Sequence, residues 1–115
     1  MNEDLHLING QIHNLEDKYV ELSHEENNIQ KQLADEAVIV KEQVTLEVDG
    51  TGKKKFTNEL LRSNEVTRRL ENNDLYKSQS LKKDKIRKEL QLMSNQVSFL
   101  KRKIRIYEIL VRMGE

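Results

Sequence analysis

The sequence predicts an all-α fold, an antiparallel helical hairpin (coiled coil) with a short third helix and a small turn or β-hairpin in the middle. Apolar residues recur at steps of three and four near both ends of the chain. Proline is absent, so nothing outside the middle of the chain breaks a helix. The 115 residues fit one domain, and a hydrophobic content of only 36% suits an elongated hairpin, in which each helix buries only a stripe.

The first long helix is expected over residues 2–38. Glu26 and Glu36 occupy core positions of its apolar seam. Either the seam loosens at these glutamates, or each pairs with a basic residue of the other helix and sets the register; we favour the looser seam. The full seam comprises Leu5, Ile8, Ile12, Leu15, Tyr19, Leu22, Glu26, Ile29, Leu33, Glu36 and Val40.

The middle of the chain, residues 39–56, allows two interpretations. Residues 44–48 alternate and are rich in β-branched side chains, and residues 49–52 form a turn signal with two glycines. A β-hairpin that pairs residues 44–48 with 53–56 is one interpretation. A first helix that continues to about Val48 and then turns is the other. We favour the hairpin slightly, although a lone hairpin is marginal in water.

A short helix is expected over residues 58–71 and the last long helix over residues 74–113. Residues 72–74 (NND) are expected to separate the two helices, with Asp74 capping the last one. A continuous helix with a kink at this point is the alternative, because asparagine is a weaker helix breaker than glycine or proline. The heptad pattern of apolar residues is weak over residues 75–85. From residue 86 onward the last helix has a regular apolar seam, formed by Ile86, Leu90, Met93, Val97, Leu100, Ile104, Tyr107 and Val111.

The last helix carries a second apolar row, roughly 130° around the helix from this seam. The short helix is too short to cover the C-terminal part of this row. We therefore predict that the row is an interface, and that two hairpins form a homodimer by packing as a four-helix bundle. This candidate interface for a second copy or a protein partner comprises Leu92, Phe99, Ile106, Ile109 and Met113.

Charge is divided unevenly although the net charge is zero. Residues 1–50 hold 12 acidic and 3 basic residues, and residues 51–115 hold 8 acidic and 17 basic residues. We interpret this mainly as a device for pairing within the protein. Two basic clusters are candidate contacts for nucleic acid or an acidic partner, although the acidic first helix and the lack of aromatic platforms disfavour nucleic acid. They are Lys53, Lys54 and Lys55, and Lys101, Arg102, Lys103 and Arg105.

No catalytic or metal-binding signature is present. Cysteine is absent, and His6, His13 and His24 are spread too far along one helix to share an ion. We expect no enzyme activity, no metal and no cofactor. No apolar run reaches the ~18 residues that a membrane span needs, and the acidic N-terminus does not look like a signal peptide. We expect a cytoplasmic protein.

A lysine-rich turn, a short helix and a break follow one another in residues 49–62 (DGTGKKKFTNELLR), 66–70 (VTRRL) and 73–76 (NDLY). This stretch, about a third of the chain, resembles small coiled-coil proteins of phages and mobile elements, some of them encoded among replication and recombination genes. It departs from their pattern in having no proline at the break. The resemblance implies a phage protein that binds or inhibits a larger partner, such as a host defence enzyme. The alternative is an accessory nucleic-acid-binding protein of phage recombination or replication.

Overall fold

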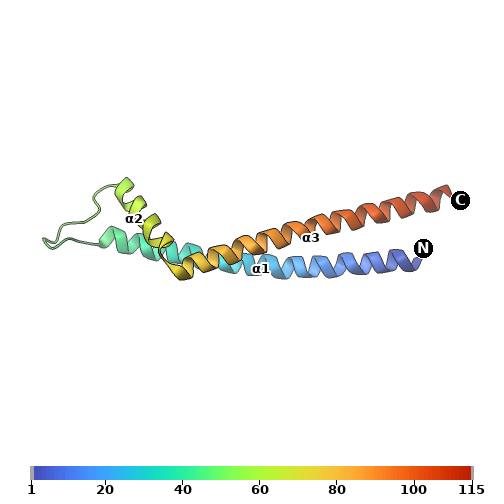
Figure 1. The fold of residues 1–115 in the computed structure, drawn as a ribbon, viewed down its shortest axis with the longest axis horizontal. Helices are drawn as coiled ribbons and strands as arrows, with labels where there is room; N and C mark the ends of the chain where they lie inside the picture. The colour runs from blue at the N-terminus through green and yellow to red at the C-terminus, as the bar shows by residue number, and fades with distance from the viewer. Residues whose placement is uncertain (1, 115) are drawn as a thin grey trace. The chain divides into compact units, whose positions relative to one another are not determined.

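The computed structural model describes residues 2–114 and confirms the all-helical class. Among these residues it contains three helices and no strand (Figure 1). Helix α1 spans Asn2–Leu46, α2 spans Glu59–Glu71 and α3 spans Asp74–Met113. The chain divides into two compact units. Unit 1 combines the residues up to Glu26 with those from Lys85 onward, and unit 2 comprises Asn27–Asp84.

In unit 1, the first half of α1 lies antiparallel to the second half of α3. Lys101 pairs with Glu16 at 3.7 Å, and Arg87 pairs with Glu26 at 3.0 Å, so residue numbers rise along one helix as they fall along the other. The seams predicted from the heptads face each other. The buried members in this unit are Ile8, Ile12, Ile86 and Leu90. Toward the chain ends the helices draw apart (Figure 1), and Val111 is exposed.

We expected the apolar seam to loosen at Glu26, and the structure shows this expectation to be wrong. Its side chain is only 19% exposed, and its Oε1 accepts a hydrogen bond from Nε of Arg87 at 3.0 Å. A carboxylate placed at a core position needs a charged partner because desolvation without one is costly. Glu26 therefore meets an arginine of the other helix.

In unit 2, the end of α1 packs against α2 and the beginning of α3. Nζ of Lys83 donates to Gln30, and Nδ2 of Asn73 donates to Oε1 of Glu36 at 3.4 Å, so α1 and α3 are antiparallel here too. Glu36, the second glutamate at a core position, thus also has a partner outside its own helix. The buried apolar residues of this unit are Ile29, Leu33, Val40 and Val44.

Helix α1 ends at Leu46, eight residues beyond the expected end at residue 38, because the seam continues. Val44 follows Val40 by four residues and is completely buried. A β-branched residue costs at most about 0.7 kcal/mol in a helix, whereas burying a valine side chain stabilises by roughly 1.5–3 kcal/mol. The hydroxyl of Thr45 donates to the carbonyl of Lys41 at 2.8 Å, within the helix. Tertiary burial outweighs the local β preference.

The expected β-hairpin is replaced by a loop with a single isolated bridge between Val48 and Lys54, since α1 takes up residues 44–46. The backbone N–H of Lys55 donates to the carbonyl of Glu47 at 2.9 Å. The carboxylate of Asp49 closes the loop by accepting from both the backbone N–H (2.8 Å) and the hydroxyl (2.6 Å) of Thr51. These bonds hold the pKa of Asp49 below its usual value. Gly52 takes a positive φ of 81°, which favours glycine.

The two remaining helices begin at asparagine caps. The side chain of Asn58 accepts from the N–H of Leu61 at 2.8 Å, and that of Asn73 accepts from the N–H of Tyr76 at 3.0 Å. The cap of α3 is therefore Asn73, and Asp74, which was expected to serve as the cap, lies in the first turn. The observed helices, residues 59–71 and 74–113, agree to within one residue with the expected helices, residues 58–71 and 74–113.

The burial of Val44 yields a stability prediction with a control two residues away. Val44→Ala should lower the free energy of unfolding by on the order of 1–3 kcal/mol, because it leaves a cavity in a packed seam. Leu46→Ala, at a side chain that is 72% exposed, should change it by less than about 0.5 kcal/mol. Urea denaturation followed by circular dichroism measures both. Equal effects would contradict the helical burial of Val44.

Candidate functional site

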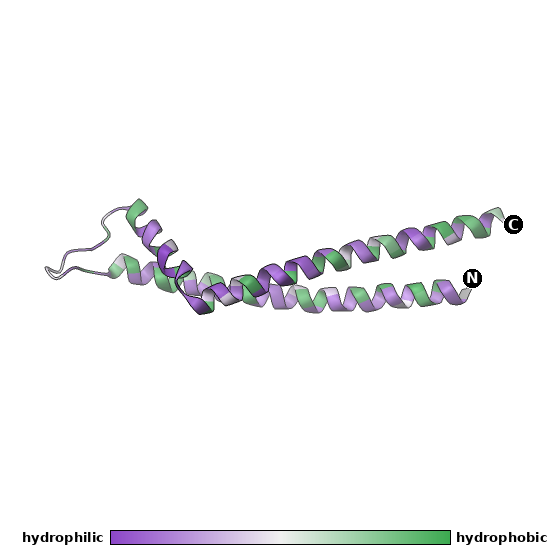
Figure 2. Ribbon diagram, viewed as in Figure 1, coloured by the Kyte–Doolittle hydropathy of each residue, from purple (hydrophilic) through white to green (hydrophobic). Residues whose placement is uncertain are grey.

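An apolar row on α3 is exposed in unit 1. The exposed fraction is 61% for Phe99 and 78% for Met113. Leu92, Ile106 and Ile109 are exposed as well, and so is Leu110, which the sequence analysis did not include. Figure 2 shows apolar segments recurring along this part of α3. We name as the α3 row the exposed residues Leu92, Phe99, Ile106, Ile109, Leu110 and Met113.

Two members of the α3 row line an open groove between α3 and α1. The groove measures about 640 Å³, and Leu92 and Phe99 form its α3 side together with Leu100. Amide side chains also line the groove. Leu15, Gln11 and Asn14 line it from α1, and Asn95 and Gln96 line it from α3. The row thus continues into a groove whose lining combines apolar side chains with hydrogen-bonding groups.

The basic residues of α3 do not form one patch, because consecutive helical residues are turned by 100°. Lys101 lies on the other side of the helix pair from the groove, where it lines a second groove with Glu16 and Tyr19. Arg105, one turn further, shares the side of Lys101, whereas Lys103 lies between Phe99 and Ile106 on the α3 row. Of the four predicted contact residues only Lys101 has an ion pair within the described chain.

In the lysine cluster of the loop in unit 2, residues 53–55, one lysine already makes contacts within the protein. Nζ of Lys55 contacts Oε1 of Glu47 at 3.5 Å and lies 5.7 Å from the centre of the Phe56 ring. Arg69 of α2 lies over the same ring at 5.9 Å and pairs with Glu47. Lys53 and Lys54 are exposed and make no ion pair within residues 2–114. Only these two lysines therefore remain available to a partner.

Glu65 is the centre of the ionic network that holds α2. Its carboxylate accepts from Nε of Arg68 at 3.0 Å and from Nε of Arg69 at 2.9 Å. The hydrogen bond from Arg68, followed by that from Arg69, lowers the pKa of Glu65 from 4.5 to about 2. The pKa of Glu47 is also lowered, chiefly by its hydrogen bond to Arg69. Arg69 thus joins α2 to the segment that follows α1.

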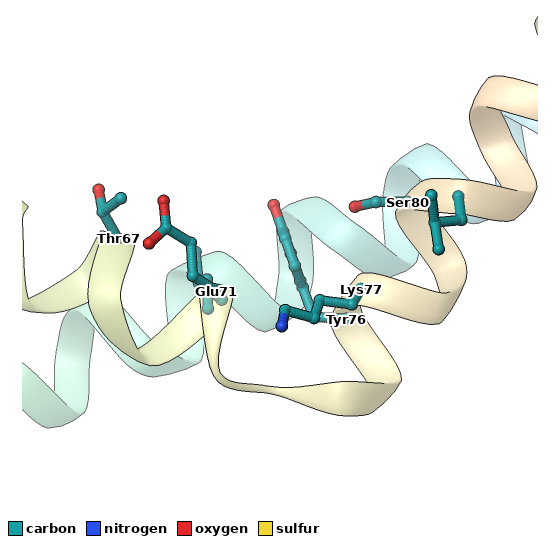
Figure 3. Close-up of a pocket in the computed structure, with 7 residues that line it drawn as sticks. Thr67, Glu71, Tyr76, Lys77 and Ser80 are labelled. Carbon is teal, nitrogen blue, oxygen red and sulfur yellow. The ribbon is translucent and has the colours of Figure 1, made fainter.

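A further groove, of about 610 Å³, lies between α2 and the first turns of α3 in unit 2 (Figure 3). Figure 3 shows Thr67 and Glu71 projecting from α2, with the ring of Tyr76 standing between Glu71 and Ser80. Leu70 and Leu81 add apolar walls, and Glu71 and Lys77 place opposite charges on the rim. The mixed lining singles out no ligand class.

Among the described residues, no three or more histidine, cysteine, aspartate or glutamate side chains come together in a way that could hold a metal ion. Within residues 2–114, no helix has a stretch long and apolar enough to cross a membrane. Comparisons with protein-family models, curated proteins and solved structures found no match. The inferred relationship to phage coiled-coil proteins therefore stays a prediction.

Sequence reasoning missed two contributors to the exposed surface of unit 1. Leu110 follows Ile106 by four residues and precedes Met113 by three, a spacing that places it on the same face. Leu7 is exposed on α1, seven residues before the groove residue Asn14, and so lies on the groove's side of that helix. Both could have been found from helical spacing once the seam was known.

The Glu65 network yields a prediction about acid. Because the folded-state pKa is about 2 and the unfolded value is 4.5, the stabilisation by Glu65 is complete above about pH 4.5 and is lost as the pH falls toward 2. An NMR titration of the Glu65 side-chain carboxyl carbon should show a midpoint near 2. The double variant Arg68→Ala/Arg69→Ala should move this midpoint up toward 4.5. An unmoved midpoint would show that the arginines are not the cause.

Proposed function

We propose that this chain is a non-enzymatic protein-interaction module, derived from a phage, that binds or inhibits a larger protein partner such as a host defence enzyme. The α3 row is the observation that supports the proposal. Large apolar side chains exposed along several turns of one helix form the kind of contiguous patch that marks an interface. An antiparallel helical hairpin, cytoplasmic and without cofactors, is the architecture that this proposal assumes.

Two kinds of occupant can cover the α3 row. A second copy of the chain would give the homodimer predicted from the sequence, as a four-helix bundle. A partner protein would leave the chain monomeric until it binds. The α1 side of the groove is lined mainly by the amides Gln11 and Asn14, so most of the apolar contact comes from α3 in either case.

A pull-down with matched variants tests this proposal. The tagged protein should retain a specific protein from an extract of the host cell, and Phe99→Ser/Ile106→Ser should lose it. Each of these two exposed side chains would stabilise the complex by roughly 1.5–3 kcal/mol on being buried there, so removing both should weaken binding by at least about a hundredfold. Val20→Ser is the control, because Val20 is exposed but lies on the other side of the helix pair. Helicity should not change in either variant. Equal retention by all three proteins would contradict the proposal.

The accessory nucleic-acid-binding function is the second candidate, supported by Lys53 and Lys54, which are exposed on the loop. Lys55 and Lys101 are paired with acidic residues of the first half of the chain. The remaining basic residues around residue 103 point in different directions.

For this reason we expect no strong binding in a filter-binding titration against DNA and RNA at two salt concentrations. Micromolar or tighter binding that falls steeply between about 50 and 200 mM salt would instead favour the nucleic-acid function, since neutralised phosphates release counterions. In that outcome Lys53→Glu/Lys54→Glu should reduce the binding and its salt dependence.

A further inference from the structure

Two basic side chains stand inside the α3 row. Lys103 follows Phe99 by four residues and precedes Ile106 by three, and Arg102 follows Phe99 by three and precedes Ile106 by four; these spacings place helical side chains on one face. Both are exposed. Within residues 2–114 neither makes an ion pair. The row is thus an apolar surface with positive charge near its centre.

Helix α1 offers Lys103 no counter-charge. The pair of Lys101 with Glu16 sets the antiparallel register in this part of unit 1. Moving along α3 from Lys101 toward its C-terminus therefore means moving along α1 from Glu16 toward its N-terminus. Residues 5–15 of α1 contain no aspartate or glutamate. Within residues 2–114, Lys103 therefore has no acidic partner, and its ammonium is left to solvent or to another molecule.

A second copy of the chain does not supply this group where it would be needed. Lys103 lies midway between Leu92 and Met113, so two rows that cover each other fully, in either direction, bring the two basic stretches together. In antiparallel rows, shifting the copies until Lys103 meets Glu89 of the second copy moves Ile106 and Met113 beyond Leu92, where that copy's row ends. In parallel rows the same pairing needs a shift of 14 residues, which leaves only the Ile106–Met113 end of one row opposite the Leu92–Phe99 end of the other. Full apolar contact and charge pairing are thus mutually exclusive in a homodimer of α3 rows.

We propose that the α3 row receives an amphipathic helix of a partner protein, with an apolar stripe flanked by acidic residues at its centre. Apolar burial favours a second copy and an acidic helix alike, so the charge around Lys103 and Arg102 decides between them. The row spans 21 residue steps from Leu92 to Met113, about 32 Å at 1.5 Å per residue, which matches a partner helix of roughly six turns. This inference rests on the proposed function and specifies the partner's chemistry.

Two synthetic helical peptides test the proposal with the full chain. Both carry leucine at a and d positions for three heptads; one has glutamate and the other has lysine at the flanking positions. In calorimetric titrations the acidic peptide should bind at least about tenfold more tightly than the basic one. Lys103→Glu should abolish or reverse this preference. Lys53→Glu, which changes the net charge equally but lies on the loop of unit 2, should retain it.

Three other results of these experiments would each contradict a different part of the proposal. Equal affinities for the two peptides, or equal effects of Lys103→Glu and Lys53→Glu, would overturn the acidic partner while leaving the row as a contact surface. An unmodified protein that is dimeric by light scattering at tens of micromolar, and becomes monomeric as Phe99→Ser/Ile106→Ser, would show that a second copy occupies the row. Peptide binding that survives Phe99→Ser/Ile106→Ser would overturn the row as the docking face. The proposed function as such is decided by the pull-down and not by the peptides.

Discussion

Burial of a narrow apolar seam along α1 is the constraint on which the rest of the structure depends. In unit 1 the seam buries Ile8 and Ile12 against α3, and in unit 2 it buries Ile29, Leu33 and Val44. A chain with only 36% hydrophobic residues can stabilise long helices only by concentrating its apolar side chains on such a stripe. The same constraint explains why α1 extends through a β-branched segment, since ending at residue 38 would expose Val40 and Val44.

Polar partners at core positions help to fix the register of this seam. Apolar layers repeated every seven residues can slide by a heptad at modest cost, whereas a glutamate at a core position is stable only opposite a donor. Glu26 meets the charged Arg87 in unit 1, and Glu36 accepts from the neutral amide of Asn73 in unit 2. The opposite charges of the two halves of the chain meet in unit 1, where Arg87 pairs with Glu26 and Lys101 with Glu16. Where α1 lacks acidic residues, as beside Lys103, the basic side chains of α3 are left for another molecule.

Helix α2 combines half-buried apolar residues with ionic contacts. None of its residues is fully buried, but Val66 and Leu70 are half-buried. Arg69 joins Glu65 to Glu47 beneath the loop, while Phe56 gives the cationic groups an aromatic surface. Such a network, exposed to solvent, is sensitive to acid and to salt. Unit 2 therefore contains a network that acid and salt weaken, and unit 1 contains the exposed apolar row.

The sequence by itself determined the helical class, the apolar seams of both long helices, and the position of the α3 row on a different face of α3 from the seam. It could do so because helical periodicity is a local property that the order of residues expresses directly. Tertiary structure decided what local preferences leave open. Val44 became helical because burial outweighs β propensity, and Glu26 became a paired core residue because an arginine of α3 lies opposite. Asn73 and not Asp74 caps α3, a choice between two neighbouring residues that both favour caps. The significance of Lys103 emerged only from the antiparallel pairing of Glu16 with Lys101, since no property of residue 103 alone shows which stretch of α1 lies beside it.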